Sequence, residues 1–359
     1  MKSMIAGVWA TLVLTTAVVA TAQTYTIIDI GVLKGDNESS GFWINNLGEV
    51  VGCSDTQTSE GYPCTGVVAG QHAFSWTKSG GIKDLGTLSG ATVSGAIGLN
   101  DAGTIVGYSN VKGKPATNFV AVQWSSTGAI TSLGTLSGGS SSAAFEINSS
   151  GVIAGDSFLS SGLVNATSWT NKNIKNLGAL PKAIFTAGLD INDSGQIVGE
   201  SVFNYGPPFK SHGFLWNGSW MKDLGTLSGG VTSIANSINN TGVIVGQSDG
   251  SNTQGHWHAV LWNTSQKIQD LGVIPGGNYS IAYAVNDSSV VVGYGNLFNN
   301  AAHAMRWTSS GGMEDLNSLI PAGSGWVLIN ANSINNIGQI TGYGTKNGHN
   351  HAFMLTPVN

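Results

Sequence analysis

The sequence is short of charge, and this shortage limits what the protein can bind. Only 9% of its 359 residues are Asp, Glu, Lys or Arg, and the 14 Lys and Arg residues are spread along the chain. A nucleic-acid-binding protein needs a dense basic patch, so we expect no nucleic-acid partner. The low charge does not indicate disorder, because the apolar residues fall in regular, strand-like runs.

Cysteine is equally scarce, since Cys53 and Cys64 are the only two. A structural metal site needs two further ligands, which this pair lacks. In an exported chain the pair predicts one disulfide that closes a loop within the first repeat. Its Cα atoms should then lie within about 7 Å of each other.

Long apolar runs are missing except at the N-terminus. There, Lys2 precedes an apolar segment at residues 4–20, and small residues lead up to Ala22. This pattern is typical of a secretory signal peptide, so we expect residues 1–22 to be cleaved and residues 23–359 to form the mature protein. The alternative, a membrane anchor, is disfavoured because the segment is short for a span and no second one follows. We therefore expect a secreted protein, extracellular or periplasmic, with no membrane span after cleavage.

What the chain has in abundance is one repeated unit, clearest at residues 237–246. An apolar residue and Asn are followed by a tight turn and then by alternating branched residues, which is the pattern of a β-hairpin. Seven copies are present, centred on Asn45, Asn100, Asn148, Asn192, Asn239, Asn286 and Asn335. Their spacing of 44 to 55 residues predicts a repeat architecture.

Each repeat contains four strand-like pieces. The first leads into the apolar-Asn pair and the second follows the turn. The third ends at Trp76, Trp124, Trp169, Trp216, Trp262, Trp307 or, in the last repeat, Leu355. The fourth is Asp84-Leu85-Gly86-Thr87-Leu88 or its counterpart, beginning at Asp223, Asp270 or Asp315. Four strands per repeat predict an all-β, seven-bladed β-propeller made of four-stranded blades.

The two chain ends support closure of the ring. The last repeat lacks a fourth strand, whereas residues 25–31 form a fourth-strand segment that belongs to no blade of their own. The N-terminal strand should therefore join the C-terminal blade, which leaves no sheet edge exposed at the seam.

Three motifs recur in fixed order: His-Ala-Phe at residues 72–74, Asp-Leu-Gly-Thr-Leu at 84–88, and Ile-Asn-x-x-Gly-x-Ile-Val-Gly hairpins. In these motifs the whole mature chain resembles the extracellular HAF-repeat family of bacterial secreted proteins. The second and third repeats depart from the pattern, with Val120 and Asn165 in place of His. The resemblance implies a secreted repeat protein and brings no established activity, catalytic residue or cofactor.

The recurring His and Asp residues are predicted to be structural. A His on the third piece precedes an Asp on the fourth across a short turn, so the two should face each other and satisfy their polar groups. The pairs are His72/Asp84, His212/Asp223, His258/Asp270, His303/Asp315 and, across the ring closure, His351/Asp29. Where His is lost Asp is lost too, as in Val120/Ser132 and Asn165/Asn176. A catalytic role for one such pair per repeat is disfavoured.

No metal or cofactor site is predicted. Asp101, Asp193 and Asp287 follow the repeat Asn, but Asn or Ser stands at the same place in other repeats. These residues are turn formers, which favour that position because their side chains bond to the backbone. No calcium-loop pattern or close His/Cys cluster accompanies them.

Residues outside the repeat pattern are the candidates for ligand binding. The loops between the second and third pieces vary most and carry Tyr62, Tyr205, Trp257 and Phe298. Aromatic residues on variable loops over a rigid ring are typical of a binding surface. The alternative, that each ring only pins its own loop, carries equal weight.

The sequence therefore predicts a monomeric, non-catalytic binding module for a glycan or a protein, which it contacts through the variable loops. One rival is a carbohydrate-active enzyme, a glycoside hydrolase or lyase, which needs paired carboxylates in a pocket. Glu146 and Glu200 are the glutamates to inspect for that role, because each lies beside a core strand. A purely structural envelope or matrix component is the third alternative.

Overall fold

A computed structural model describes residues 24–358, apart from 57–63, 65–69, 115–117 and 172. The predicted signal peptide, residues 1–22, lies outside the described residues. So does Tyr62, one of the predicted ligand-binding residues.

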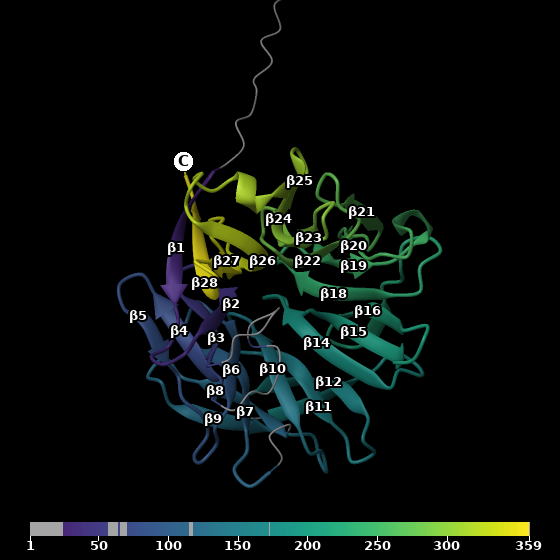
Figure 1. Cartoon of the computed structure of the whole chain (residues 1–359). Helices are drawn as coiled ribbons and strands as arrows, with labels where there is room; N and C mark the ends of the chain where they lie inside the picture. Colours follow the sequence, from purple (N-terminus) through teal and green to yellow (C-terminus); the bar gives the residue numbers. More distant parts are fainter. Residues whose placement is uncertain (1–23, 57–63, 65–69, 115–117, 172, 359) are drawn as a thin grey trace, which may run out of the picture.

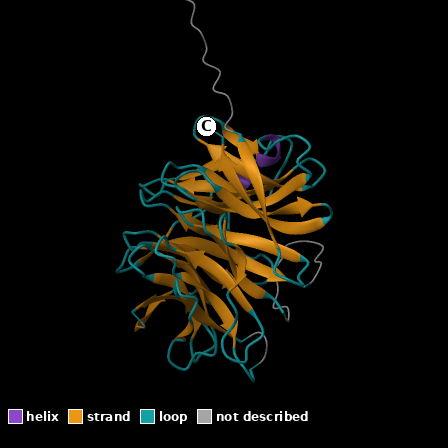
Figure 2. Cartoon of the chain, turned by 90° about the vertical axis from the view of Figure 1, so that its left-hand side faces the viewer, coloured by secondary structure: helices purple, strands orange, loops and turns teal. Residues whose placement is uncertain are grey.

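The described chain is a seven-bladed β-propeller, as the sequence predicts (Figure 1). Its 28 strands form seven groups of four antiparallel strands, and two short 3₁₀ helices, η1 (Ser251–Thr253) and η2 (Leu316–Ser318), are the helical elements of the described residues. Figure 2 shows that strands make up most of the ring and that loops cover its outer surfaces.

Blades 1 to 6 each follow chain order from the inner to the outer strand. Blade 1 contains β2 (Glu38–Ile44), β3 (Val50–Asp55), β4 (His72–Thr77) and β5 (Gly81–Asp84). Blade 2 contains β6 (Ser94–Leu99), β7 (Ile105–Asn110), β8 (Phe119–Trp124) and β9 (Ile130–Gly134). Blade 3 contains β10 (Ser142–Ile147), β11 (Ile153–Phe158), β12 (Val164–Thr170) and β13 (Asn173–Gly178).

The next three blades repeat this order. Blade 4 contains β14 (Phe185–Ile191), β15 (Ile197–Asn204), β16 (Lys210–Trp216) and β17 (Met221–Asp223). Blade 5 contains β18 (Ser233–Ile238), β19 (Ile244–Ser248), β20 (His258–Trp262) and β21 (Ile268–Gly272). Blade 6 contains β22 (Ser280–Val285), β23 (Val291–Asn296), β24 (Ala302–Thr308) and β25 (Gly312–Asp315).

Blade 7 joins the two ends of the chain. It contains β26 (Trp326–Ile334), β27 (Ile340–Lys346), β28 (His349–Pro357) and, as its outer strand, β1 (Tyr25–Gly31). Strand β1 pairs antiparallel with β28, starting with Tyr25 opposite Pro357. The predicted closure by the N-terminal strand is therefore confirmed.

The fourth strands differ from their predicted positions. The Asp of the Asp-Leu-Gly segment ends the strand in blades 1, 4 and 6 instead of beginning it. In blade 1 the carboxylate of Asp84 accepts a hydrogen bond from the backbone N–H of Gly86, whose φ is +68°. This local bond closes a turn directly after Asp84, and the pairing between strands stops there. Strand β5 therefore ends at Asp84 instead of beginning at it.

Apolar side chains fill the spaces between neighbouring blades, where seven separate clusters form. The Trp residues that end the third strands are buried, and Trp124, Trp169 and Trp262 are among the largest fully buried side chains. Two indole N–H groups also reach the preceding blade, from Trp124 to the Leu85 carbonyl and from Trp262 to the Leu224 carbonyl. These residues therefore pack between neighbouring blades.

A closed ring of hydrogen bonds links all seven blades through the repeat asparagines. Each Asn side chain donates its amide to the backbone carbonyl of the equivalent Asn in the next blade, at 2.9–3.3 Å, and Asn335 returns to Asn45. The same side chain holds its own turn: the Oδ1 atom of Asn148, for example, accepts from the N–H groups of Ser150 and Val152. The asparagines are thus inter-blade connectors as well as turn formers.

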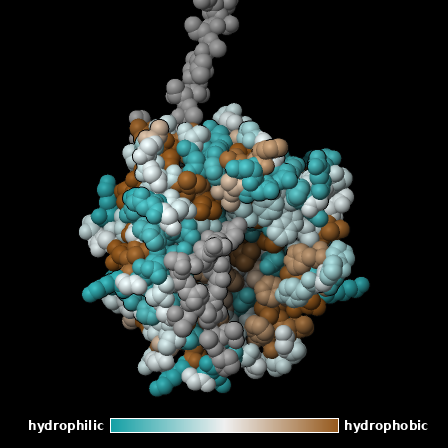
Figure 3. Space-filling model, in the orientation of Figure 1, coloured by the Kyte–Doolittle hydropathy of each residue, from teal (hydrophilic) through white to brown (hydrophobic). Residues whose placement is uncertain are grey.

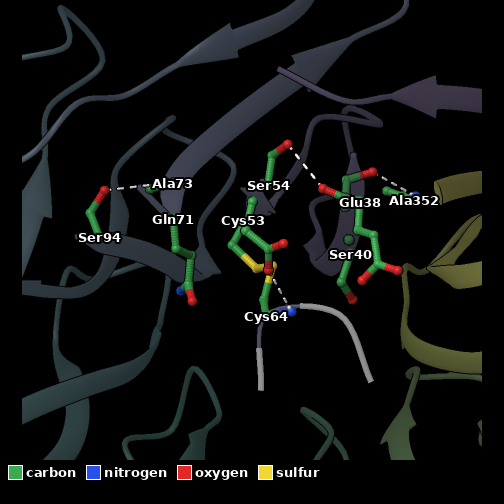
Figure 4. The surroundings of a disulfide bond; sticks show 12 residues. Glu38, Ser40, Cys53, Ser54, Cys64, Gln71, Ala73, Ser94 and Ala352 are labelled. Carbon is green, nitrogen blue, oxygen red and sulfur yellow. Dashed lines mark hydrogen bonds between the residues drawn. A yellow bond between two sulfur atoms is a disulfide. The ribbon is translucent and has the colours of Figure 1, made fainter. Parts of the chain in front are cut away.

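The disulfide predicted between Cys53 and Cys64 is present, with a Cα–Cα distance of 6.3 Å (Figure 4). Cys53 lies on β3 and is fully buried, whereas Cys64 belongs to the loop that connects β3 to β4. The bond fastens Cys64 to the second strand of blade 1.

Candidate functional site

Two of the predicted ligand-binding aromatics are exposed on the loop face, the side of the ring on which the second-to-third strand loops emerge. Tyr205 is 62% exposed and Phe298 is 93% exposed. Trp257 differs, because its indole N–H donates to the Thr232 hydroxyl at 3.0 Å and its ring lies 6.3 Å from that of Tyr279. Trp257 therefore anchors its own loop, while Tyr205 and Phe298 present their rings to solvent.

A larger feature of the ring, which the sequence did not predict, is a set of β-bulges. Every inner strand breaks its register with the second strand at the same position of the repeat, and β26 in blade 7 has a further break between Leu328 and Asn330. A bulge leaves one residue unpaired and redirects its side chain. The bulged residues are Phe42, Ile97, Phe145, Leu189, Asn236, Tyr283 and Asn332. All seven are half-buried, whereas most of their strand neighbours are buried.

The seven bulged residues line one cavity of about 380 Å³ in the middle of the ring, here called the bulge cavity. The other described residues of its lining are Trp43, Cys64 and Tyr108. The face of the ring seen in Figure 3 is hollowed at its centre, and hydrophobic residues form part of the wall of the hollow. A cavity of this size falls in the range of small-molecule sites.

A second cavity of about 170 Å³, the turn-side cavity, is lined by the apolar-Asn pairs of all seven blades and by the residues after them. It adjoins the bulge cavity at Trp43, which lines both. Two buried carboxyl groups, Glu146 and Asp190, belong to its wall. Burial raises the pKa of Glu146 well above its usual value, and the charge of Asp190 adds to this effect. Burial also raises the pKa of Asp190, to about 6.

A further pair of carboxyl groups lies on the second strands of blades 3 and 4. Burial raises the pKa of Asp156 to about 7, with a smaller contribution from the charge of Glu200. Burial likewise raises the pKa of Glu200 to about 7. The pKa of the Tyr205 hydroxyl is raised by burial and by the charges of both carboxylates, so this loop residue lies within their electrostatic reach. Of the two glutamates singled out from the sequence, Glu146 faces the ring centre and Glu200 has an acidic neighbour.

The five predicted His/Asp pairs are all formed, with Nδ1 of each His 2.7–3.0 Å from a carboxylate oxygen. In blade 3 the substituted pair is bonded too, since the Asn165 amide donates to Oδ1 of Asn176 at 3.0 Å. No member of these pairs lines either cavity. Their geometry agrees with the predicted structural role.

Two classes of site have no support among the described residues. No group of three or more His, Cys, Asp or Glu side chains there is arranged to hold a metal ion. In the same part of the chain, no helix has the length and apolar character needed to cross a membrane.

Comparison with known proteins bears on the fold alone. No protein-family model and no curated protein matches this chain. Among solved structures, the extracellular domain of a one-component system from B. thetaiotaomicron is similar over 94% of this chain, with a TM-score of 0.53 and 7% identity. The match spans only 40% of that protein's length.

Two other similar structures are propeller proteins at lower scores. The β-propeller domain of the Trilobed protease from Pyrococcus furiosus matches 78% of this chain and 95% of its own, with a TM-score of 0.39 and 8% identity. TolB from Acinetobacter baumannii matches 87% of this chain and 80% of its own, with a TM-score of 0.43 and 11% identity.

Proposed function

We propose that this protein is an exported, non-catalytic binding module that takes a glycan or a protein partner on its loop face. One observation supports this most directly: Tyr205 and Phe298 expose 62% and 93% of their surface on loops of the same face. Large aromatic rings in water contribute little to a ring already held by seven inter-blade clusters. Aromatic rings stack on sugar faces and often dominate the binding energy of protein interfaces.

Export fits the disulfide, which persists in oxidising compartments. The resemblance of the repeat motifs to the HAF-repeat family of bacterial secreted proteins points the same way, as does the N-terminal apolar segment at residues 4–20. We place the mature protein, residues 23–359, in the periplasm or outside the cell and propose that it acts as a monomer.

The test compares the mature protein with a Tyr205→Ala/Phe298→Ala double variant on a glycan array and in a pull-down from the native cell envelope. Trp220→Ala is the matched control, because Trp220 is 54% exposed on a turn between the third and fourth strands, at the opposite face. We expect the double variant to lose binding by about tenfold or more and the control to keep it. Unchanged binding by the double variant would exclude the loop face as the site.

A carbohydrate-active enzyme is the second candidate, favoured by the raised pKa values of Asp156 and Glu200. A carboxyl group with a pKa near 7 can act as a general acid at neutral pH, and glycoside hydrolysis requires a second carboxylate beside it. The test is hydrolysis of glycans identified on the array. Hydrolysis by the wild type that is lost in Asp156→Asn and in Glu200→Gln would show that the protein is an enzyme. Absence of hydrolysis by the wild type would favour the non-catalytic binding module.

A further inference from the structure

The bulge cavity has an aromatic-rich wall, because half of the ten described residues that line it are aromatic. They come from blades 1, 2, 3 and 6, so they face the cavity from several directions: Phe42, Trp43, Tyr108, Phe145 and Tyr283. The ring of Tyr283 is held in place by stacking on Tyr294, with centroids 5.8 Å apart. The negative faces of aromatic rings attract cations, and an enclosure of several rings suits an alkylated ammonium group.

The side-chain oxygens of Asn236 and Asn332, in the blades on either side of Tyr283, are fixed in orientation as hydrogen-bond acceptors. The side-chain amide of Asn236 donates to the Ala282 carbonyl at 2.8 Å, and that of Asn332 donates to the Gly41 carbonyl at 2.8 Å. Each bond ties the NH₂ end of the amide to the neighbouring blade. The Oδ1 atoms accept no hydrogen bond from the described residues, so the polar side of the cavity offers acceptors to a hydroxyl or N–H donor.

The charge around the cavity has one sign. Among the described residues, no Lys, Arg or His lines either of the two cavities. Five carboxyl groups line the adjoining turn-side cavity: Asp101, Glu146, Asp190, Asp193 and Asp287. Glu146 is 3% exposed, and its Oε2 atom has no hydrogen-bond partner in the described part of the chain. A cation in the ring centre would therefore meet carboxyl oxygens on the turn side, with no opposing basic charge among the described lining residues.

We propose that the bulge cavity binds a small organic cation with a methylated ammonium group and a hydroxyl donor, the chemistry of choline. The aromatic residues would surround the methyl groups, and an amide oxygen of Asn236 or Asn332 would accept the hydroxyl. The cavity volume of about 380 Å³ accommodates such a molecule. This site is separate from the glycan or protein site proposed on the loop face and does not depend on it.

The first test is isothermal titration of the mature protein with choline and with 3,3-dimethyl-1-butanol, which has the same shape but no charge. We expect saturable binding of choline and an affinity for the neutral alcohol lower by about tenfold or more. Phosphocholine should also bind more weakly, because its phosphate replaces the hydroxyl donor and would face the acceptor oxygens of Asn236 and Asn332. Equal affinity for choline and the alcohol, or no saturable binding of choline, would overturn the proposal.

Choline groups also occur on lipids, so vesicles of phosphatidylcholine form a separate arm. Because the cavity lies inside the ring, we expect free choline to bind and the vesicles not to bind. Vesicle binding without binding of free choline would contradict the proposal of a site for a small cation.

Two variants distinguish the contribution of an aromatic side chain to choline affinity from that of apolar packing. Phe145→Leu keeps an apolar side chain but removes the aromatic face, and should weaken choline binding by a factor of about 3 to 30. Leu189→Met alters the packing of the same wall at the equivalent bulge in blade 4 without removing an aromatic face, so its loss of affinity should be smaller than that of Phe145→Leu. Thermal unfolding confirms that both variants fold. Equal losses in both would show that packing, and not the aromatic face, determines affinity.

The Tyr205→Ala/Phe298→Ala variant distinguishes the two proposals. It should lose the loop-face partner and bind choline unchanged. A parallel loss of choline binding would contradict the separation of the two sites.

Discussion

Nδ1 of His351 lies 3.0 Å from Oδ1 of Asp29, although the two residues are 322 positions apart in the sequence. The contact joins the last strand of the chain to the first one and repeats, across the ring closure, the His/Asp pair of four other blades. Burial alone would raise the pKa of Asp29, but hydrogen bonds from His351 and Lys346 outweigh it and hold the pKa at about 2.

The first prediction follows from a difference between two of these pairs. His303→Ala leaves Asp315 without its His partner and should lower the free energy of unfolding by about 1–3 kcal/mol. His351→Ala should cost less, because Lys346 still donates to Asp29 at 3.0 Å. Urea unfolding of both variants measures the difference. His256→Ala, in an exposed loop, is the control, and a loss there as large as in His303→Ala would contradict the argument.

The second prediction concerns the asparagine ring. Asn148→Ala removes a bond to the Asn192 carbonyl and two bonds to its own turn, from Ser150 and Val152. Because the Asn148 side chain is buried, the Asn192 carbonyl and the two turn N–H groups would lose their partners away from water. We therefore expect a loss of about 2–4 kcal/mol in unfolding free energy.

Ser150→Ala in the same turn is the control, because Ser150 is exposed and its hydroxyl makes no hydrogen bond with the described residues. Asn148→Asp isolates the inter-blade bond, since it keeps an acceptor for the turn but no longer donates to Asn192. An Asp variant as stable as the wild type would show that the ring bond contributes nothing.

Local sequence rules predicted the ring closure but missed the asparagine ring. Strand periodicity, turn residues and the orphan segment at residues 25–31 fix blade count and closure, because each is a short-range or counting signal. The role of Asn148 in holding its turn follows from the same rules. Its bond to Asn192 does not, because it depends on how neighbouring blades approach each other in space.

The candidate site was only partly accessible to the same reasoning. Exposure of Tyr205 and Phe298 follows from their place on variable loops, whereas the anchoring bond from Trp257 to Thr232 depends on the fold. The sequence does carry a signal for the bulge residues. Each stands two positions before the apolar residue of the repeat pair, as Phe145 does before Ile147, and it varies between repeats while the residue before it is always Gly or Ala. Variation at a fixed repeat position is the pattern expected of a binding wall on a constant scaffold.

The third prediction uses the one repeat that breaks the turn rule. Six of the seven hairpin turns have Gly with positive φ, such as Gly242 at +86°, whereas blade 6 has Ser289 at +59°. A side chain at positive φ is strained, so Ser289→Gly should raise the unfolding free energy by about 0.5–1 kcal/mol.

The reverse change provides the comparison. Gly242→Ala should destabilise by a similar amount through backbone conformation alone, because no atom lies closer than 4.0 Å to the added Cβ. Urea unfolding of both variants measures the two effects, and a Ser289→Gly protein less stable than the wild type would contradict the account.

The last prediction concerns the dependence of stability on pH. In the unfolded chain Asp156 and Glu200 ionise near their ordinary values of 3.8 and 4.5, whereas burial raises both pKa values to about 7 in the folded protein. Between about pH 4 and 7 the folded protein therefore binds more protons at these groups than the unfolded chain does. Their contribution to stability is fully present below pH 4 and is lost as the pH rises through 7.

Asp156→Asn and Glu200→Gln remove this dependence while keeping the shape of the side chains. Each variant should match the wild type near pH 4 and exceed its unfolding free energy at pH 8, by up to about 3 kcal/mol for Asp156 and by less for the more exposed Glu200. Urea unfolding at pH 4, 6 and 8 measures the differences. Wild-type and variant stabilities that run parallel across this range would show that the two carboxyl groups are solvated in the folded protein, which would also remove the main support for an acid–base role.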